Sequence, residues 1–463
     1  MPEHESLGPL PSGDPARPHR PPLVSGGFFV FLLVWPILWS NAKIVDASDP
    51  GRWVSLPTTV RFVEPAVILG VIALAYLFGR PSRDRFTTSI LRWLGILGVA
   101  GIVGSILAPP GVLNMLYGIY DVMVAFVLLV AALVVGFDRT ELMKLTRYLV
   151  LLCLLNWIVG VVQAVVLGVE ADLIHGLFND ANTMSTVFYV LSGYCLYRYA
   201  LSRSLPHLFY GLFLLPIAYL GFNEKLNLFF LGCMMPLVFL RLRKRLLPVI
   251  LAGVTGVLLI VATVDFAASR GLSGRTSQVS DLTAQRGGLV ALGVIRSWPL
   301  AWEQIKDQPL ELLFGSGASN YGGPVAAGRF NNGTATTITN EIFEFQTGRE
   351  YLGAFDSPTN YFSNVLAEFG LVGFLAALAL LGRIVWTLHR LGAWHSDPDL
   401  VAWAWAAKWG WIVVAMQAVF VPFGAFGNLA VMTPIVLATA VVVSEGSRRP
   451  HMLPAPVYAA ARR

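Results

Sequence analysis

The residues best suited to chemistry gather in one polar stretch, 265–360, in which Arg, Asp, Glu, Gly and Asn are dense. Both flanking regions are almost unbroken apolar sequence, and a long polar loop between such regions is typical of a functional segment. Inside the stretch, FGSGASNYGG at 314–323 predicts a glycine-rich turn whose backbone N–H groups can approach an anion. Turns of this composition also occur in loops that bind nothing. We therefore expect function from the stretch as a whole, not from the turn alone.

Charged residues in the apolar regions need a reason to be there. Lys225 lies at the end of a predicted membrane helix, directly after Glu224. A charge at that depth is costly unless it faces a wet cavity, pairs with a neighbour or reaches the lipid headgroups. All three interpretations of Lys225 are open. Lys408, near the middle of a later apolar run, needs a partner for the same reason.

The composition defines the broad class. Of 463 residues, 56% are hydrophobic and only 13% are charged, and the mean hydropathy is +0.65. A soluble domain carries about a quarter charged residues, so the sequence predicts an all-α polytopic membrane protein. A nucleic-acid partner is excluded because no basic cluster is interleaved with stacking aromatics. The cysteines have neither disulfide nor metal-ligand spacing, and they are Cys153, Cys195 and Cys233.

Apolar runs long enough to cross about 30 Å of hydrocarbon predict about twelve membrane helices. The predicted spans are 27–43, 65–79, 88–108, 114–136, 146–168, 182–200, 205–221, 225–241, 246–264, 360–387, 400–421 and 426–443. They divide the chain into regions with different roles. These are a disordered cytoplasmic tail at 1–25, an N-terminal helix bundle at 26–264, a large loop at 265–359, C-terminal helices at 360–445 and a cytoplasmic tail at 446–463.

Basic residues alternate between the predicted loops. They fall in every second loop, at Arg80, Arg83, Arg85, Arg139, Lys144, Arg147, Arg198, Arg203, the cluster 241–245, Arg383, Arg390, Arg448 and Arg449. The short loops around 109–110 and 421–423 carry none. The positive-inside rule then predicts that both termini are cytoplasmic and that the large loop is outside. In a bacterium with an envelope, that side is the periplasm.

One part of the loop, 286–310, spaces its apolar residues at helical intervals. Pro299 predicts a break into two short helices. Trp298 and Trp302 favour a position at the membrane interface, lying over the bundle.

Several short motifs follow one another in a recognisable order. They are FNDANTMST at 178–186, LGFNEKLNLFFLGC at 220–233, RLRKR at 241–245, IRSWPLAWEQIKDQPLELLFGSG at 295–317 and TNYFSNVLAEFGLVG at 359–373. Between about 205 and 384 the chain resembles the superfamily of O-antigen ligases and Wzy-type O-antigen or exopolysaccharide polymerases. The order of the motifs around one loop carries this resemblance, since each motif is short.

The resemblance implies an architecture and a reaction. The architecture would be that of a GT-C-like membrane glycosyltransferase in the bacterial inner membrane. The reaction would be metal-independent and cofactor-free glycosyl transfer at the periplasmic face. The donor would be an oligosaccharide on a polyprenyl diphosphate, and the acceptor a sugar hydroxyl. A flippase and a chain-length regulator of the same pathway would be the protein partners.

The resemblance also implies roles for particular residues. Lys225 and Arg296 would be the catalytic cations that absorb the charge of the diphosphate, with Arg286 as the alternative loop arginine. The other implied substrate-binding residues are Glu224, Asn182, Gly315, Gly317, Asn360 and Tyr361. Arg349 and Arg61 could also close over the donor.

The expected general base is the point at which this chain departs from the family. Ligases carry His before the Asn that starts the helix after the loop, and here Thr359 holds that place. Asp356 is the candidate base if burial raises its pKa, although it could instead cap the turn before Ser357. Glu368 is a second candidate or an internally satisfied acid. The absence of His favours a polymerase over a ligase.

Three functions are therefore open. The first is a polymerase of lipid-linked repeat units, and the second is a ligase that moves a finished glycan to a lipid A-core or other acceptor. The third is a transporter or flippase. Against it stands the lack of an internal sequence repeat between the two halves of the chain.

Overall fold

We describe a computed structural model of the chain. The structure describes residues 22–40, 44–46, 49–54, 63–78, 84–166, 177, 181–211, 288–321, 360–420 and 425–448. Most of them are helical. The helices are α1 (Pro22–Ser40), α2 (Val63–Phe78), α3 (Arg85–Leu107), α4 (Val112–Val135), α5 (Arg139–Val161), the π-helix η2 (Val162–Val166), α6 (Ala181–Ser202), α11 (Gly288–Ile305), α12 (Pro309–Phe314), α15 (Tyr361–Trp394), α16 (Pro398–Phe420), the 3-10 helix η6 (Ala425–Gly427) and α17 (Leu429–Arg448).

The helices support the prediction of an α-helical membrane protein. Within the described residues, five are long and apolar enough to cross a bilayer, and they are Arg85–Leu107, Val112–Val135, Arg139–Val161, Tyr361–Ala393 and Leu429–Gly446. The helices α1, α2, α6 and α16 coincide with further predicted spans. The predicted span 205–221 is described only as far as residue 211, and the predicted spans 225–241 and 246–264 lie outside the described residues. The count of about twelve spans stays a prediction.

One short hairpin interrupts the helices of the described residues. Two strands, β1 (Ile44–Asp46) and β2 (Asp49–Val54), pair antiparallel between α1 and α2 in the chain. Each strand is too short for its alternation of side chains to be read from the sequence. The hairpin lies beyond the apolar run that predicted the first span.

Capping residues set several helix starts. The side chain of Asp84 accepts the N–H of Thr87 at 2.6 Å and begins α3. Asp138 and Glu141 form a capping box that begins α5. At the C-terminal end of α4, Gly136 has φ 71, a left-handed conformation that ends the helix. The polar connections between apolar runs therefore fix the helix boundaries.

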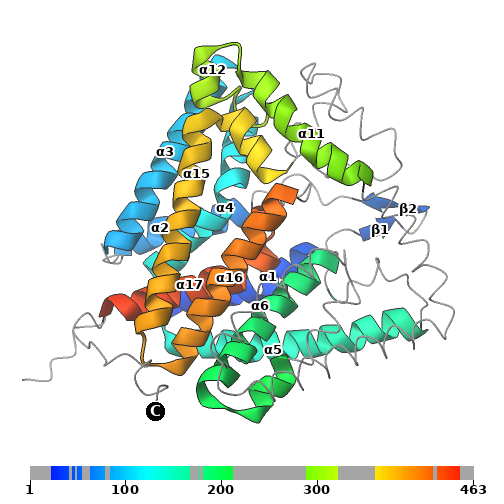
Figure 1. Cartoon of the computed structure of the whole chain (residues 1–463), viewed down its shortest axis with the longest axis vertical. Coiled ribbons are helices and arrows are strands. Elements are labelled where there is room, and N and C mark those ends of the chain that lie inside the picture. Colours follow the sequence, from blue (N-terminus) through cyan, green and yellow to red (C-terminus); the bar gives the residue numbers. More distant parts are fainter. Residues whose placement is uncertain are drawn as a thin grey trace, which may run out of the picture.

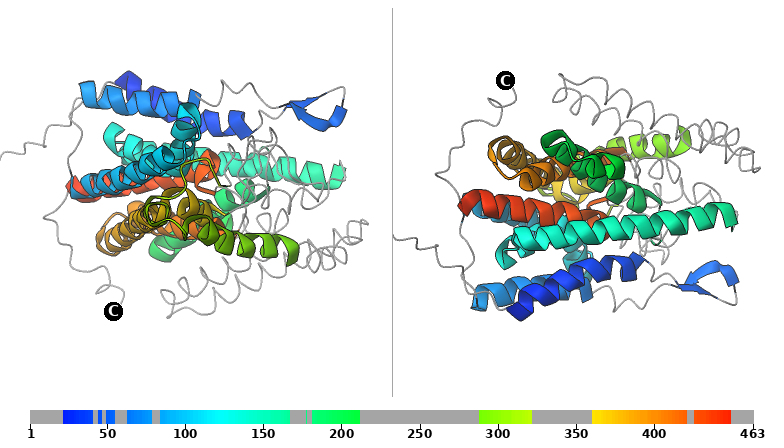
Figure 2. Two further views of the ribbon diagram at one scale, coloured as in Figure 1. Left: turned by 90° about the horizontal axis from the view of Figure 1, so that it is seen from above. Right: turned by 90° about the horizontal axis from the view of Figure 1, so that it is seen from below.

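α15 lies at the centre of the packing. It contacts α3 on one side and α16 on the other, while α16 also packs on α6 and α17 (Figure 1). Figure 2 shows α1 along one side of the molecule, α15 and α16 along the other, and α5 and α17 between them. An aromatic cluster holds the middle of this arrangement: Phe126 stacks on Trp411 at 5.7 Å and on Phe426 at 5.8 Å between ring centroids.

α15 is broken at Gly370, which has φ 65 and ψ −168 inside the helix. These angles are open to glycine and costly for other residues. In Figure 1 the first, yellow part of α15 meets the remainder at an angle close to α12. The first part begins at Asn360, whose side chain accepts the N–H of Ser363 at 2.8 Å.

The predicted break at Pro299 is wrong. α11 continues through Pro299 as one helix, and a separate short helix, α12, follows from Pro309. An interior proline removes one backbone hydrogen bond, and tertiary packing can compensate for that loss. Here Trp298 packs edge-on against Phe374 of α15 at 6.1 Å. Trp302 remains 46% exposed on the outer side of α11.

Two groups of helix ends are joined by polar contacts, and each group contains ends that the pattern of basic loops assigns to the same side. At the "loop end", the N–H of Ala318 donates to Ser105, the Ser319 hydroxyl to the Asn114 carbonyl, and the Asn320 amide to the Ala108 carbonyl. These contacts join residues 315–321 to the end of α3 and the start of α4. At the "charged end", Arg139, Arg198, Asp397 and Asp399 join α5, α6 and the start of α16. The side of the membrane on which each end lies stays a prediction.

Candidate functional site at the glycine-rich turn

The glycine-rich turn lies directly against the break in α15. The N–H of Ser316 donates to the Ala367 carbonyl at 2.8 Å, and the N–H of Gly317 donates to the Glu368 carbonyl at 3.2 Å. The Ser316 hydroxyl donates to the Ala367 carbonyl as well, at 3.0 Å. A bend at Gly370 opens these carbonyl groups to donors from outside the helix. The turn thus supplies backbone partners to α15 at the point where the helix changes direction.

The carboxylate of Glu368, on α15, accepts hydrogen bonds from the backbone of the turn. Glu368 is 3% exposed, and its two carboxylate oxygens accept separate backbone N–H groups. Oε2 accepts the N–H of Ser319 at 2.8 Å, and Oε1 accepts the N–H of Tyr321 at 3.0 Å. The turn therefore does hold an anion, as its composition predicts, but the anion is the carboxylate of Glu368.

The backbone N–H groups of Gly315 and Gly317, two of the predicted substrate-binding residues, donate to partners within the protein. The N–H of Gly315 donates to the Glu311 carbonyl at 2.7 Å, and that of Gly317 is taken by α15. Both glycines have positive φ, 81 and 94. A Cβ at Gly315 would come within 2.2 Å of the Glu368 carbonyl carbon. These glycines therefore serve the close approach of the turn to α15.

A buried polar chain then connects the turn to α11 and back to the start of α15. The Tyr321 hydroxyl donates to the Ser297 carbonyl at 2.5 Å. The Asn360 amide donates to the Ser297 hydroxyl at 2.9 Å. Tyr321 and Asn360 are fully buried, and Ser297 is 2% exposed. Because each buried group has a partner, the three segments are held in one register.

Two glycines of the bundle make room for the turn. A Cβ at Gly104 of α3 would lie 2.4 Å from the Phe314 carbonyl oxygen, and one at Gly118 of α4 would lie 2.1 Å from the Ser319 hydroxyl. Neither distance is tolerated by real Cβ atoms, so any larger residue would push the turn outward. The turn is thus inserted between α3, α4 and α15.

The charges beside the turn are less enclosed. Partial burial raises the pKa of the Glu311 carboxyl on α12. The hydrogen bond that Lys306, at the end of α11, donates to the Glu303 carboxylate raises the pKa of Lys306. Neither Glu311 nor Lys306 belongs to the set joined by the buried hydrogen bonds of Glu368, Tyr321, Ser297 and Asn360, which we call the junction.

The structure brings together several of the predicted site residues. Asn360 and Tyr361 start α15, and the Tyr361 hydroxyl donates to the Val122 carbonyl at 2.9 Å. Arg296 is the neighbour of Ser297 on α11, although its side chain is outside the described part. Asn182 lies in the first turn of α6, apart from the junction, and its side chain is likewise not described. The remaining candidates lie outside the described residues, and they are Arg61, Lys225, Glu224, Arg286, Arg349 and Asp356.

Three residues of the junction were not predicted for their part in it. Glu368 was considered as a base or as a satisfied acid, and its contacts agree with the second alternative. A signal existed, because an acid two residues before a glycine inside an apolar helix needs donors and marks a break. Tyr321 and Ser297 gave no such signal, since both are common in loops and amphipathic helices.

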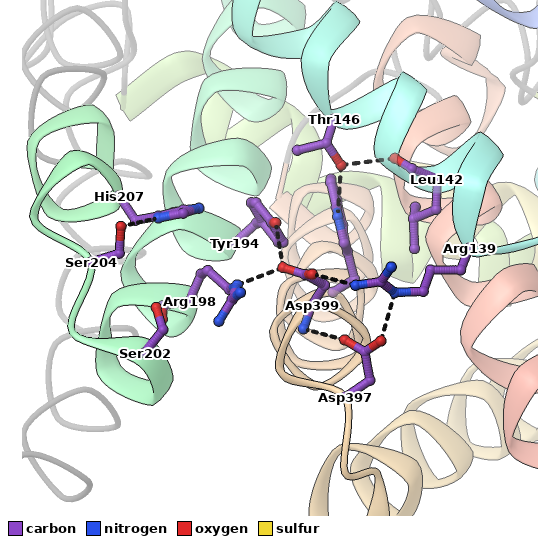
Figure 3. A network of polar contacts seen from close by, with 11 residues as sticks. Arg139, Leu142, Thr146, Tyr194, Arg198, Ser202, Ser204, His207, Asp397 and Asp399 are labelled. Atoms are coloured by element: carbon purple, nitrogen blue, oxygen red, sulfur yellow. Dashed lines mark hydrogen bonds and ion pairs between the residues drawn. The ribbon is translucent and has the colours of Figure 1, made fainter.

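A second polar cluster occupies the charged end (Figure 3). Asp399, at the start of α16, accepts Arg198 Nε at 2.5 Å and Arg139 Nη2 at 2.8 Å. The Tyr194 hydroxyl donates to the same carboxylate at 3.2 Å. Arg139 Nε also contacts Asp397 at 2.6 Å. Arg139 and Arg198, which the sequence marked as topology signals, therefore also bind helix ends together.

Lys408 of α16 has aromatic partners. Its ammonium nitrogen lies 3.5 Å from the ring centroid of Trp405 and 5.0 Å from that of Trp409. Such contacts stabilise a desolvated cation. Lys408 is 6% exposed and lies away from the glycine-rich turn in the chain, on α16.

The class of this protein follows from its fold and composition, because no protein-family model and no curated protein sequence matches this chain. Within the described residues, no group of three or more His, Cys, Asp or Glu could hold a metal ion. Fold and composition together define an α-helical membrane protein in which the glycine-rich turn at 315–321 is packed against the end of α3, the start of α4 and the first part of α15.

Proposed function

We propose that this protein is a polymerase of polyprenyl-diphosphate-linked oligosaccharide repeat units, acting at the outer face of a bacterial inner membrane. One observation carries the proposal. The loop motif around Ser297, the turn at Tyr321 and the helix start at Asn360 are far apart in the sequence and joined by buried hydrogen bonds. These are the segments whose order resembles the glycan polymerases and ligases.

The reaction assigns a task to each candidate residue. An acceptor hydroxyl oxygen attacks the anomeric carbon of the donor sugar, and the bond from that carbon to the diphosphate oxygen breaks. The electron pair leaves with the diphosphate, whose charge Arg296 and Lys225 would neutralise. The hydroxyl proton would pass to Asp356. Glu224 and Asn182 would help to bind the substrates, and Arg286 is the alternative to Arg296 as the loop cation.

The packing of the junction supports this use of the loop. The hydrogen bond between Asn360 and Ser297 fixes the position of α11, and with it the backbone of the adjacent residue Arg296. Transfer without a metal depends on such fixed charges, because their position replaces the Lewis acid. A loop that only connected two membrane helices would not need buried hydrogen bonds that join its own helix α11, its glycine-rich turn and the start of α15.

The direct test uses purified protein in nanodiscs with a defined polyprenyl-diphosphate repeat unit. We expect a ladder of longer glycans together with release of polyprenyl diphosphate. The variants Arg296→Ala, Lys225→Ala and Asp356→Asn should each abolish the ladder. Lys306→Ala is the matched control, since it removes an exposed cation at the end of the same helix as Arg296. Retention of the full ladder in all three site variants would refute the assignment.

A deletion strain distinguishes the neighbouring functions. Loss of long chains, with single repeats still made and attached, supports polymerisation. Normal long chains that fail to reach a lipid A-core acceptor would instead indicate a ligase. Repeat units that accumulate on the cytoplasmic side would indicate a flippase, and either of these two results overturns the proposal.

A further inference from the structure

We infer that Glu368 is a positioning residue: its carboxylate fixes the glycine-rich turn, and the turn fixes the register of α11 through Tyr321 and Ser297. The inference deepens the proposed function, and its activity readout rests on that function. The contact itself does not depend on which reaction the protein performs.

The first step is the hold of Glu368 on the turn. Its two oxygens take the N–H groups of Ser319 and Tyr321, so both acceptor sites have donors aimed at them. Ser319 has φ 69, a left-handed conformation that is uncommon for residues other than glycine. Such a backbone persists when its surroundings enforce it, and here the carboxylate and the Asn114 carbonyl do so.

The second step carries the constraint to α11. Tyr321 is bound at both of its ends, by Glu368 at the backbone N–H and by the Ser297 carbonyl at the hydroxyl. Its ring is fully buried and has few rotamers. A shift of the turn would therefore either break the bond to Ser297 or move α11 with it.

The third step connects α11 back to α15. Ser297 accepts the amide of Asn360, and Asn360 starts the helix that carries Glu368. Glu368, Tyr321, Ser297 and Asn360 thus form a closed path through three segments. Arg296 is joined to Ser297 by one peptide bond, so its origin is set by this path. A catalytic cation displaced by about 1 Å can lose a hundredfold in rate.

Glu368→Gln is the sharpest variant for the test. It keeps the volume of the side chain but replaces one acceptor oxygen by an NH₂ group, which then faces a backbone N–H donor. Tyr321→Phe removes only the hydroxyl that binds Ser297. It provides a milder variant in case Glu368→Gln does not reach the membrane. Glu368→Asp keeps both acceptor oxygens and should restore part of what Gln loses.

The matched controls repeat each chemical change elsewhere. Glu303→Gln converts an exposed acid of α11 whose partner is Lys306. Tyr148→Phe removes a hydroxyl that donates to the Leu33 carbonyl at 2.8 Å, the same type of bond between two other helices. Neither residue belongs to the proposed catalytic machinery.

The experiment measures amide hydrogen exchange of α11 and the kinetics of polymerisation in nanodiscs. We expect Glu368→Gln and Tyr321→Phe to speed exchange in 288–305 and to lower kcat by about tenfold or more with KM nearly unchanged. The two controls should change neither. Unchanged exchange of α11 in both variants, or a loss of activity through KM alone, overturns the inference.

The two proposals fail in different ways. If wild-type protein releases no polyprenyl diphosphate while both variants still speed exchange of α11, the proposed function is wrong and the positional role of Glu368 stands. If wild-type protein polymerises and both variants retain full kcat, the function stands and the role of Glu368 is wrong.

Discussion

The loop end and the charged end of the molecule hold polar groups in different ways. At the loop end, Glu368 accepts the backbone N–H groups of Ser319 and Tyr321, and both of these residues are buried. At the charged end, Asp399 is bound by two arginines, and the Arg139 side chain is 49% exposed. One end uses the backbone of a turn, and the other uses long cationic side chains.

This difference indicates different tasks. Backbone donors have fixed directions, so a buried carboxylate that they bind fixes the segment to within a few tenths of an ångström. Arginine side chains adapt to movement, and ion pairs that reach solvent are screened by salt. We therefore expect the loop end to hold precise geometry and the charged end to tie three helix ends together with some freedom.

The largest effect should come from Gly370→Ala. A Cβ there would lie 2.5 Å from backbone atoms of Leu313 and Gly315, and the positive φ would add strain. Together these effects should cost about 3 kcal/mol or more of stability, because backbone atoms cannot move aside. Thermal unfolding in detergent measures the loss.

Gly382→Ala is the control for that variant. It lies on the same helix with nothing within 4 Å of its Cβ position. Equal unfolding midpoints for Gly370→Ala and Gly382→Ala would contradict the picture of a turn packed into the break of α15.

The next effect should come from Gly104→Ala on α3. Its Cβ would lie 2.4 Å from the Phe314 carbonyl oxygen, so the turn must move outward, at a cost of about 1–3 kcal/mol. Gly95→Ala, on the same helix, meets nothing within 4 Å. Hydrogen exchange of 315–321 should rise in the first variant and stay unchanged in the second. A rise in neither would show that the turn is not held by α3.

Much of the helical frame could be predicted from the sequence. Long apolar runs end at Pro109–Pro110 or at capping residues such as Asp84 and Asp138, and the helices follow them closely. The alternation of basic loops also placed the start of α5, the end of α6 and the start of α16 on one side, and Arg139, Arg198 and Asp399 join these three ends. These signals are local or compositional, so one sequence is enough to read them.

The junction could not be predicted, because its contacts connect distant parts of the chain. Glu368 binds Ser319 and Tyr321 from 49 and 47 residues away, and nothing in the turn specifies its partner. A glycine-rich turn predicts that N–H groups converge, not which anion they receive. In the same way, the pairing of Arg139 with Asp399 spans 260 residues.

At the charged end, Asp399→Asn should have the largest effect. The Asp399 side chain is 10% exposed and receives Arg139, Arg198 and Tyr194. Loss of its charge takes the carboxylate away from Arg198, whose side chain is 18% exposed, while Arg139 keeps its ion pair with Asp397. We expect a loss of about 1–3 kcal/mol, between the values for exposed and buried pairs. Unfolding midpoints in detergent would measure it. A loss as large as that of Gly370→Ala would break the distinction between the two ends.

The smallest effect should come from Asp397→Asn. Asp397 also accepts the N–H of Asp399 at 2.8 Å, and asparagine can keep that cap, so the variant isolates the ion pair with Arg139. Because Arg139 is 49% exposed, we expect a loss of no more than about 1 kcal/mol. At 1 M salt, where the Debye length is about 3 Å, this loss should nearly vanish. The loss from Glu368→Gln should be the same at both salt concentrations, since the N–H donors of Ser319 and Tyr321 are uncharged and buried. An equal response of both variants to salt would contradict the distinction between screened ion pairs at the charged end and buried backbone hydrogen bonds at the loop end.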